Sequence, residues 1–173
     1  MILMALNIIV AIVTGFGQNY ATIFANNFTL TLQHLQLYRL ITSMFYHYGL
    51  LHLMCNMSCL LSLGLVTEEI FGKKKFVIAY FATGIIGETI ALFIHQLMGQ
   101  NVLSAGASGC IFGLLGLLIA SMPGDIKTKI KTSIINFLPV LLIGLVGNID
   151  NATHIACFLV GVLISPLLKN NKK

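Results

Sequence analysis

The chain has 173 residues, of which 57% are hydrophobic and only 9% are charged, and its net charge is +5. Soluble domains carry about 25% charged residues, so this composition excludes an ordinary soluble domain and indicates a membrane protein. The lysines stand in short clusters between hydrophobic runs, which excludes a nucleic-acid-binding surface as the reason for the positive charge.

A spanning helix needs about 20 apolar residues, so the length allows about six spans joined by short loops. No room remains for a separate soluble domain, and residues 1–173 are predicted to form one domain. The region 17–46 is amphipathic and is predicted to be a structured loop in the membrane interface. Charged loops are predicted at 68–75 and 124–131, and a turn at 147–151. The six predicted spans are 2–16, 49–66, 76–98, 108–122, 132–146 and 152–168.

The lysines predict the orientation of these spans. With six spans, the two charged loops and the C-terminal tail lie on one side, and together they carry all nine lysines. Cytoplasmic loops are enriched in lysine and arginine, so both termini are predicted to be cytoplasmic, in a plasma-membrane protein.

Ser108 lies between Gly106 and Gly109, directly before an apolar run. Glycine permits a tight turn, and a serine at the start of a helix lies beside unpaired backbone N–H groups. Such a position suits a nucleophile whose attack creates an oxyanion. The alternative is that these residues only cap a helix and pack closely, as serine commonly does.

The estimated depth of Ser108 in the membrane favours its interpretation as a nucleophile. Counted from the cytoplasmic ends of their spans at about 1.5 Å per residue, Ser108 and His154 both lie about 22 Å up. His52 and Asn56 lie about 24 and 18 Å up, so polar residues from three spans share one layer nearer the outer face. A serine and a histidine at one depth are a candidate nucleophile and base. His52, Asn56 and the Ser108 N–H are candidate oxyanion donors. The alternative for each histidine alone is a structural hydrogen bond between helices, which is the more frequent role of a lone membrane histidine.

Other polar residues leave alternatives open. Asp150 could orient His154 as a third catalytic residue or cap the helix, and the cap is favoured. Glu88 is predicted to be protonated or hydrogen-bonded between helices, with substrate contact as a weaker alternative. No metal or other cofactor is predicted, because HExxH is absent and the cysteines lack paired spacing. The cysteines are Cys55, Cys59, Cys110 and Cys157.

Four motifs resemble those of the rhomboid family of intramembrane serine proteases, over the chain from about Tyr38 to Gly161. Gly106-Ala-Ser-Gly109 matches the GxSG motif, and His52-Leu-Met-Cys-Asn56 matches HxxxN. His154 followed by Gly161 resembles HxxGxxxG, and Tyr38-Arg39 resembles a Trp-Arg pair. The resemblance implies a Ser108–His154 dyad, an oxyanion hole from His52, Asn56 and the Ser108 N–H, and a six-span bacterial-type core that cleaves transmembrane substrates.

Three residues depart from the family pattern: Tyr38 replaces Trp, Cys157 stands where Gly is frequent, and Phe112 stands where some members have Tyr. Phe112 can still stack on the imidazole, whereas Cys157 could loosen the packing of the last span on the fourth. Gly106, Gly109 and Gly161 are expected to let the chain approach closely around the dyad.

The sequence therefore predicts an all-α, polytopic membrane protein, a bundle of six transmembrane helices with an interfacial loop after the first. Its expected function is an intramembrane serine endopeptidase that cleaves transmembrane helices near the outer face. Its expected partners are transmembrane protein substrates and the lipid bilayer, with no nucleic acid, and the oligomeric state is open. The alternative is a non-catalytic rhomboid-like scaffold or a transporter, which would need neither Ser108 nor His154.

Overall fold

The computed structural model describes residues 2–15, 19–146 and 149–168, and for residues 137–146 it describes the backbone. Within these ranges the secondary structure is helical except for one isolated bridge between Asn26 and Ser104. Each predicted span contains a helix. The tail lysines and the first residues of the predicted turn, 147 and 148, lie outside the described residues. The helices are α1 (Ile2–Thr14), α4 (Leu50–Phe71), α5 (Lys73–Leu97), α6 (Ser108–Ser121), α7 (Ile126–Val146) and α8 (Asn151–Leu168).

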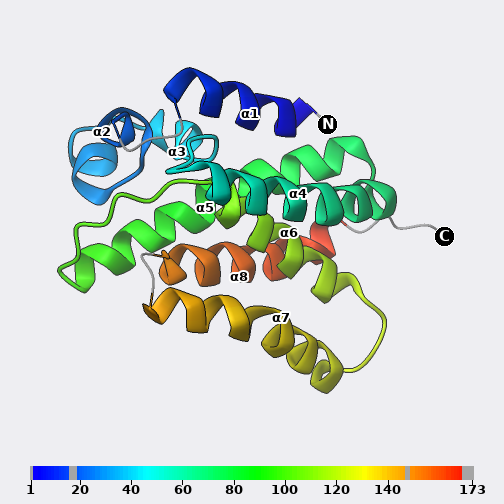
Figure 1. Cartoon of the computed structure of the whole chain (residues 1–173). Helices are drawn as coiled ribbons and strands as arrows, with labels where there is room; N and C mark the ends of the chain where they lie inside the picture. The colour runs from blue at the N-terminus through cyan, green and yellow to red at the C-terminus, as the bar shows by residue number, and fades with distance from the viewer. Residues whose placement is uncertain (1, 16–18, 147–148, 169–173) are drawn as a thin grey trace.

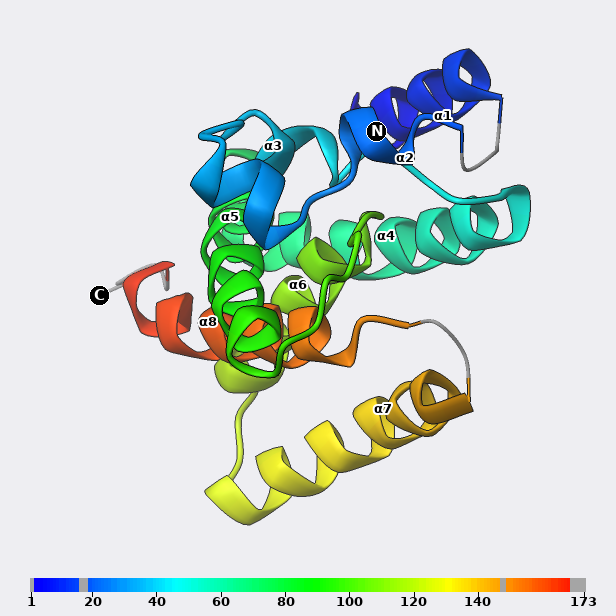
Figure 2. The same cartoon turned by 90° about the vertical axis from the view of Figure 1, so that its left-hand side faces the viewer.

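Helix α6 is the centre of the bundle (Figure 1). It packs most extensively against α8, then against α5 and α4, while α7 contacts it little. A helix that is apolar all round is stable when other helices surround it, and Leu114 and Leu117 of α6 are completely buried. Figure 2 shows α7 standing apart from the other helices.

Three of the described helices, α4, α5 and α8, are long and apolar enough to cross a membrane. Helices α1 and α6 are apolar but shorter, with 13 and 14 residues. Large apolar side chains such as Leu51, Leu163 and Leu167 are more than 70% exposed on the outside of α4 and α8. Apolar surfaces of this kind are stable against lipid and not against water.

The predicted charged loop at 68–75 is wrong, because helix replaces nearly all of it. Helix α4 continues to Phe71, Gly72 alone separates the helices with φ of 85°, and α5 begins at Lys73. Glutamate and lysine are good helix formers, so charge ends the apolar run without ending the helix. For the same reason α7 begins at Ile126, inside the second predicted loop.

The region 19–49, before α4, is structured, and its position in the membrane interface stays a prediction. Arg39 is buried and donates to the carbonyls of Ala25, at 2.8 Å, and Thr22, at 2.7 Å. These bonds fold the region back on itself, and Figure 1 shows it at one end of the bundle. Its short helices are α2 (Ala21–Phe24), the π-helix η1 (Thr29–Gln33) and α3 (Arg39–Thr42).

Candidate active site

Ser108 is the first residue of α6, and two hydrogen bonds donated by backbone N–H groups hold the turn before it. The Gly106 N–H donates to the Ser43 carbonyl at 2.8 Å, and the Ala107 N–H donates to His47 Nε2 at 3.5 Å. Gly106 has φ of 123°, a conformation that side chains with a Cβ rarely adopt. The sequence therefore needs glycine here to bring the chain into the helix at this angle.

The Ser108 hydroxyl oxygen lies 2.8 Å from His154 Nε2, across the contact between α6 and α8. For serine to donate this hydrogen bond, the neutral imidazole must carry its proton on Nδ1. The ring of Phe112, one turn further along α6, stacks on the imidazole with centroids 4.4 Å apart. His154 is only 5% exposed, whereas Ser108 is partly exposed. This arrangement can make serine a nucleophile with histidine as its base.

His52 and Asn56 lie on one face of α4, against Gly106. A Cβ at Gly106 would lie 2.8 Å from the His52 ring and 3.4 Å from Asn56 Nδ2. Within the described residues, Asn56 Nδ2 is buried without a hydrogen-bond partner. A buried unpaired donor is costly, so it marks a place where a further acceptor can bind.

His52 is held by two aromatic neighbours. The His47 ring lies 4.9 Å away in an edge-on arrangement, and the Tyr48 ring stacks nearly parallel at 6.5 Å. His47 donates from Nδ1 to the Phe45 carbonyl, 3.2 Å away, which leaves Nε2 as the acceptor for the Ala107 N–H. Burial, together with nearby His52, lowers the pKa of His47 to about 4, so the ring is neutral as this tautomer requires.

Asp150 contacts the backbone and His95 rather than the His154 ring. Its Oδ1 accepts from the Thr153 N–H at 3.0 Å, and its Oδ2 accepts from the Thr153 hydroxyl at 2.7 Å. These bonds form the favoured helix cap, on the first turn of α8. His95 Nε2 lies 3.0 Å from Oδ1 and ties α5 to this cap.

Burial alone would raise the pKa of Asp150, but the hydrogen bonds from His95 and Thr153 outweigh burial and hold it below the ordinary value. Asp150 is therefore ionised at neutral pH. His154 Nδ1 is buried without a partner among the described residues, so they supply no third member of a triad.

Small residues allow α6 and α8 to touch through their backbones. A Cβ at Gly161 would lie 2.0 Å from the Gly113 carbonyl oxygen. The expected loosening at Cys157 does not occur, because Gly87 of α5 and Gly109 of α6 make room for the thiol. A Cβ at Gly87 would lie 2.4 Å from Cys157 Sγ, and one at Gly109 would lie 3.2 Å from it.

The structure thus brings together Ser108, His154, His52 and Asn56, which sequence reasoning selected. It adds His47, which the sequence analysis did not select and which holds the turn before Ser108. No fixed spacing in the sequence connects His47 with residue 107, so only the folded chain identifies that contact.

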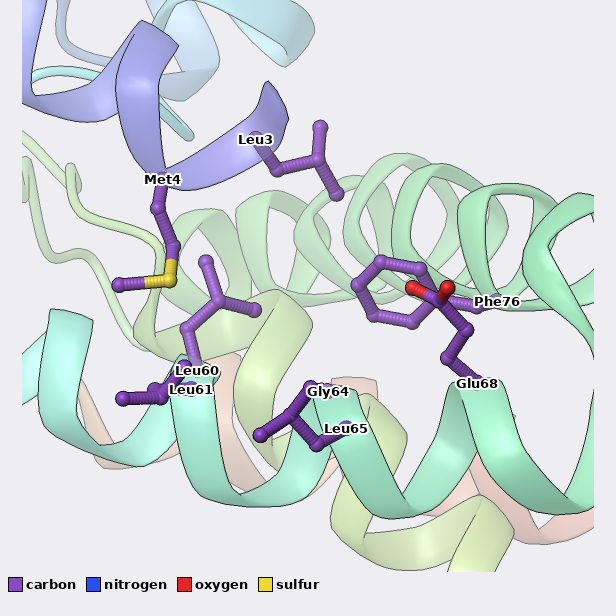
Figure 3. A pocket seen from close by; sticks show the side chains of 8 residues that line it. All are labelled: Leu3, Met4, Leu60, Leu61, Gly64, Leu65, Glu68 and Phe76. Atoms are coloured by element: carbon purple, nitrogen blue, oxygen red, sulfur yellow. The ribbon is translucent and has the colours of Figure 1, made fainter. Parts of the chain in front are cut away.

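A small hollow lies elsewhere, between α1, α4 and α5 (Figure 3). Its lining is apolar except for Glu68, and it contains none of the four selected site residues. It therefore tells nothing about the chemistry of Ser108. The lining residues are Leu3, Met4, Leu60, Leu61, Gly64, Leu65, Glu68 and Phe76.

Together, the apolar helices define a helical membrane protein, and a contact between a partly buried serine and a buried histidine lies at its centre. A family model, the Rhomboid domain, matches residues 34–171. The chain belongs to the rhomboid family and is a polytopic membrane protein.

Similar proteins include proteases and an inactive relative. The chain is 35% identical to rhomboid protease GluP of Bacillus subtilis over 76% of its own length and 26% of that protein. It is 31% identical to rhomboid-like protease 3 of Toxoplasma gondii, over 86% of this chain and 55% of that protein. It is also 31% identical to inactive RHOMBOID-like protein 8 of Arabidopsis thaliana, over 75% of this chain and 37% of that protein. The chain thus spans about half or less of the length of these relatives.

Proposed function

We propose that the chain is an intramembrane serine endopeptidase that cleaves transmembrane helices of other membrane proteins. The observation that carries this proposal is the 2.8 Å contact between the Ser108 hydroxyl and His154 Nε2. Family membership alone does not decide activity, because one similar protein is named inactive.

In the proposed reaction His154 removes the proton from Ser108 as its oxygen attacks the scissile carbonyl. His154 then gives that proton to the leaving amine, and water hydrolyses the acyl-enzyme. Phe112 keeps the imidazole in the plane that faces the hydroxyl, because the two rings stack. The neutral ring is the form that can accept the proton.

The oxyanion would bind between α4 and the start of α6. Asn56 Nδ2 is available because no described group pairs with it, and Gly106 brings the chain close to His52. The Ser108 N–H, at the first position of α6, is a third donor. Donors fixed in a site that excludes water stabilise developing charge without reorganising.

We further propose six spans with both termini cytoplasmic, in the plasma membrane. Helix α6 rises about 21 Å and cannot cross a core about 30 Å thick. Ser108 would therefore lie inside the membrane nearer the outer face, where a substrate helix must unwind locally before its carbonyl is reached. Substrates should carry weak helix formers near the cut.

The test is labelling with a fluorophosphonate probe, together with cleavage of a membrane-inserted substrate. Wild type is expected to be labelled, and Ser108→Ala and His154→Ala are each expected to lose labelling and cleavage while staying folded. Thr89→Ala is a matched control, because its hydroxyl bonds only to the Ile85 carbonyl of its own helix among the described contacts. Cleavage by Ser108→Ala at the wild-type rate would instead point to a scaffold or to a contaminating protease.

A further inference from the structure

Glu88 of α5 is a buried acidic residue that the proposed chemistry does not use. Its side chain is 2% exposed, which is costly for a carboxyl group at membrane depth. The ion pairs in the described part of the chain, Lys73–Glu68 and His95–Asp150, do not include it. A buried carboxyl group without an ion pair needs hydrogen-bond donors, and the position of these donors indicates what Glu88 does.

Those partners come from the region between α1 and α4. Glu88 Oε2 accepts from Asn26 Nδ2 at 2.7 Å and from the Ser43 hydroxyl at 2.8 Å. Both donors are buried, so each depends on this oxygen to satisfy its side chain. One carboxylate oxygen thus fixes two residues that are 17 positions apart in the sequence.

The same two residues hold the chain that leads into Ser108. Asn26 and Ser104 exchange both backbone hydrogen bonds, each at 2.8 Å. The Ser43 carbonyl accepts the Gly106 N–H at 2.8 Å. Glu88 therefore orders residues that hold this segment at two points, one on each side of residue 105.

The placement of Gly106 matters for the site. Its Cα faces the His52 ring so closely that an added Cβ would lie only 2.8 Å away. A displacement here would change the distance between the donors of α4 and the Ser108 oxygen. Misplacement of reacting groups by about 1 Å can lower a rate by about 10²-fold.

We propose that Glu88 is a positioning residue for the reaction of Ser108, acting through Asn26 and Ser43 on residues 104–106. The proposal rests on the proposed protease function for its catalytic consequence. It depends on an acceptor oxygen at Oε2, so an amide at this position restores the contact and an apolar side chain of similar length removes it. The informative pair of variants is therefore Glu88→Gln and Glu88→Met.

Turnover and amide exchange are measured on the purified full chain in detergent. Glu88→Met is expected to lower kcat for a transmembrane substrate by about 10-fold or more, with KM within about 3-fold, because positioning acts on the bound complex. Amide exchange in residues 104–107 is expected to quicken, while exchange in α8 is unchanged. Glu88→Gln is expected to remain within about 3-fold of wild type in kcat, since its amide oxygen can accept the same bonds.

A second variant covers the case in which Glu88→Met does not fold. Ser43→Ala removes one donor and keeps the carbonyl that holds Gly106, so exchange in residues 104–107 is expected to rise and kcat to fall. Thr89→Val, next to Glu88, is the control and should change neither.

Exchange is also measured in a Ser108→Ala background, so it does not depend on activity. If wild type is not labelled at Ser108, the protease function fails, and exchange alone still decides whether Glu88 holds the segment. Unchanged exchange in Glu88→Met and Ser43→Ala, an unchanged kcat, or an equal rise in exchange throughout the protein would each overturn the proposal.

Discussion

The contact between α6 and α8 gives the sharpest prediction, for the substitution Gly161→Ala. The added methyl group would lie 2.0 Å from the Gly113 carbonyl oxygen and 3.0 Å from the Leu117 nitrogen. Both are backbone atoms of α6, so no side-chain rotation relieves the overlap. The helices themselves must separate.

The size of that separation follows from the geometry. Ordinary contact begins at 3.4 Å, so the shortfall is 3.4 − 2.0, or about 1.4 Å. Ser108 and His154 lie on these same two helices with their atoms 2.8 Å apart. Even half of the shift would stretch this pair to about 3.5 Å, the outer limit of a hydrogen bond. The expected loss in kcat is about 10²-fold, and overpacking should cost about 1–3 kcal/mol of stability.

The assay is the rate of fluorophosphonate labelling at Ser108, measured beside the thermal unfolding midpoint. Gly64→Ala in α4 is the matched control, because its Cβ would meet the Phe76 ring at an ordinary 3.4 Å. The control should label at the wild-type rate. Labelling of Gly161→Ala within about 3-fold of wild type would refute the argument that this contact sets the distance between serine and base.

Two further predictions concern the polar residues around the dyad. Asn56→Ala should lower kcat by about 10²–10³-fold with little change in KM, and an unchanged kcat would remove Asn56 from the oxyanion hole. Asp150→Asn keeps the cap and should keep kcat within about 3-fold, whereas a loss of about 10⁴-fold would make Asp150 a catalytic partner. Because the pKa of Asp150 is lowered in the fold, its carboxylate stabilises the protein above the unfolded pKa. The difference in unfolding midpoint between wild type and Asp150→Asn should therefore shrink as pH falls below about 4.

The contact between Ser108 and His154 could be predicted from the sequence because helical rise is nearly constant. Counting residues from the charged ends placed Ser108 and His154 at one height, and in the fold their atoms lie 2.8 Å apart. The same counting needed no knowledge of which helices are neighbours. The wrong charged loop after α4 did not affect this result, because Ser108 and His154 were each counted from the end of their own span.

The contacts that hold the site could not be predicted in this way. Asp150 meets His95 across 55 positions, and Glu88 meets Asn26 across 62 positions. Such pairs depend on which faces of α5 meet the neighbouring segments, and a polar residue in an apolar helix does not encode its partner. The cost of a bare carboxylate at membrane depth predicted that Glu88 would be protonated or hydrogen-bonded between helices. In the fold its donors are instead Asn26 and Ser43, which lie outside the helices in the segment before α4.

The short length of α6 explains why the region after α1 belongs to the site. A helix that begins at Ser108 leaves the preceding backbone irregular and buried, with Ser104 at 8% and Ala107 at 0% exposure. Buried N–H and C=O groups must be paired, and here their partners are Asn26, Ser43 and His47. The family model begins at residue 34, so it includes Ser43 and His47 and omits Asn26. The chain thus completes the support of its candidate nucleophile with a residue outside the part that defines its family.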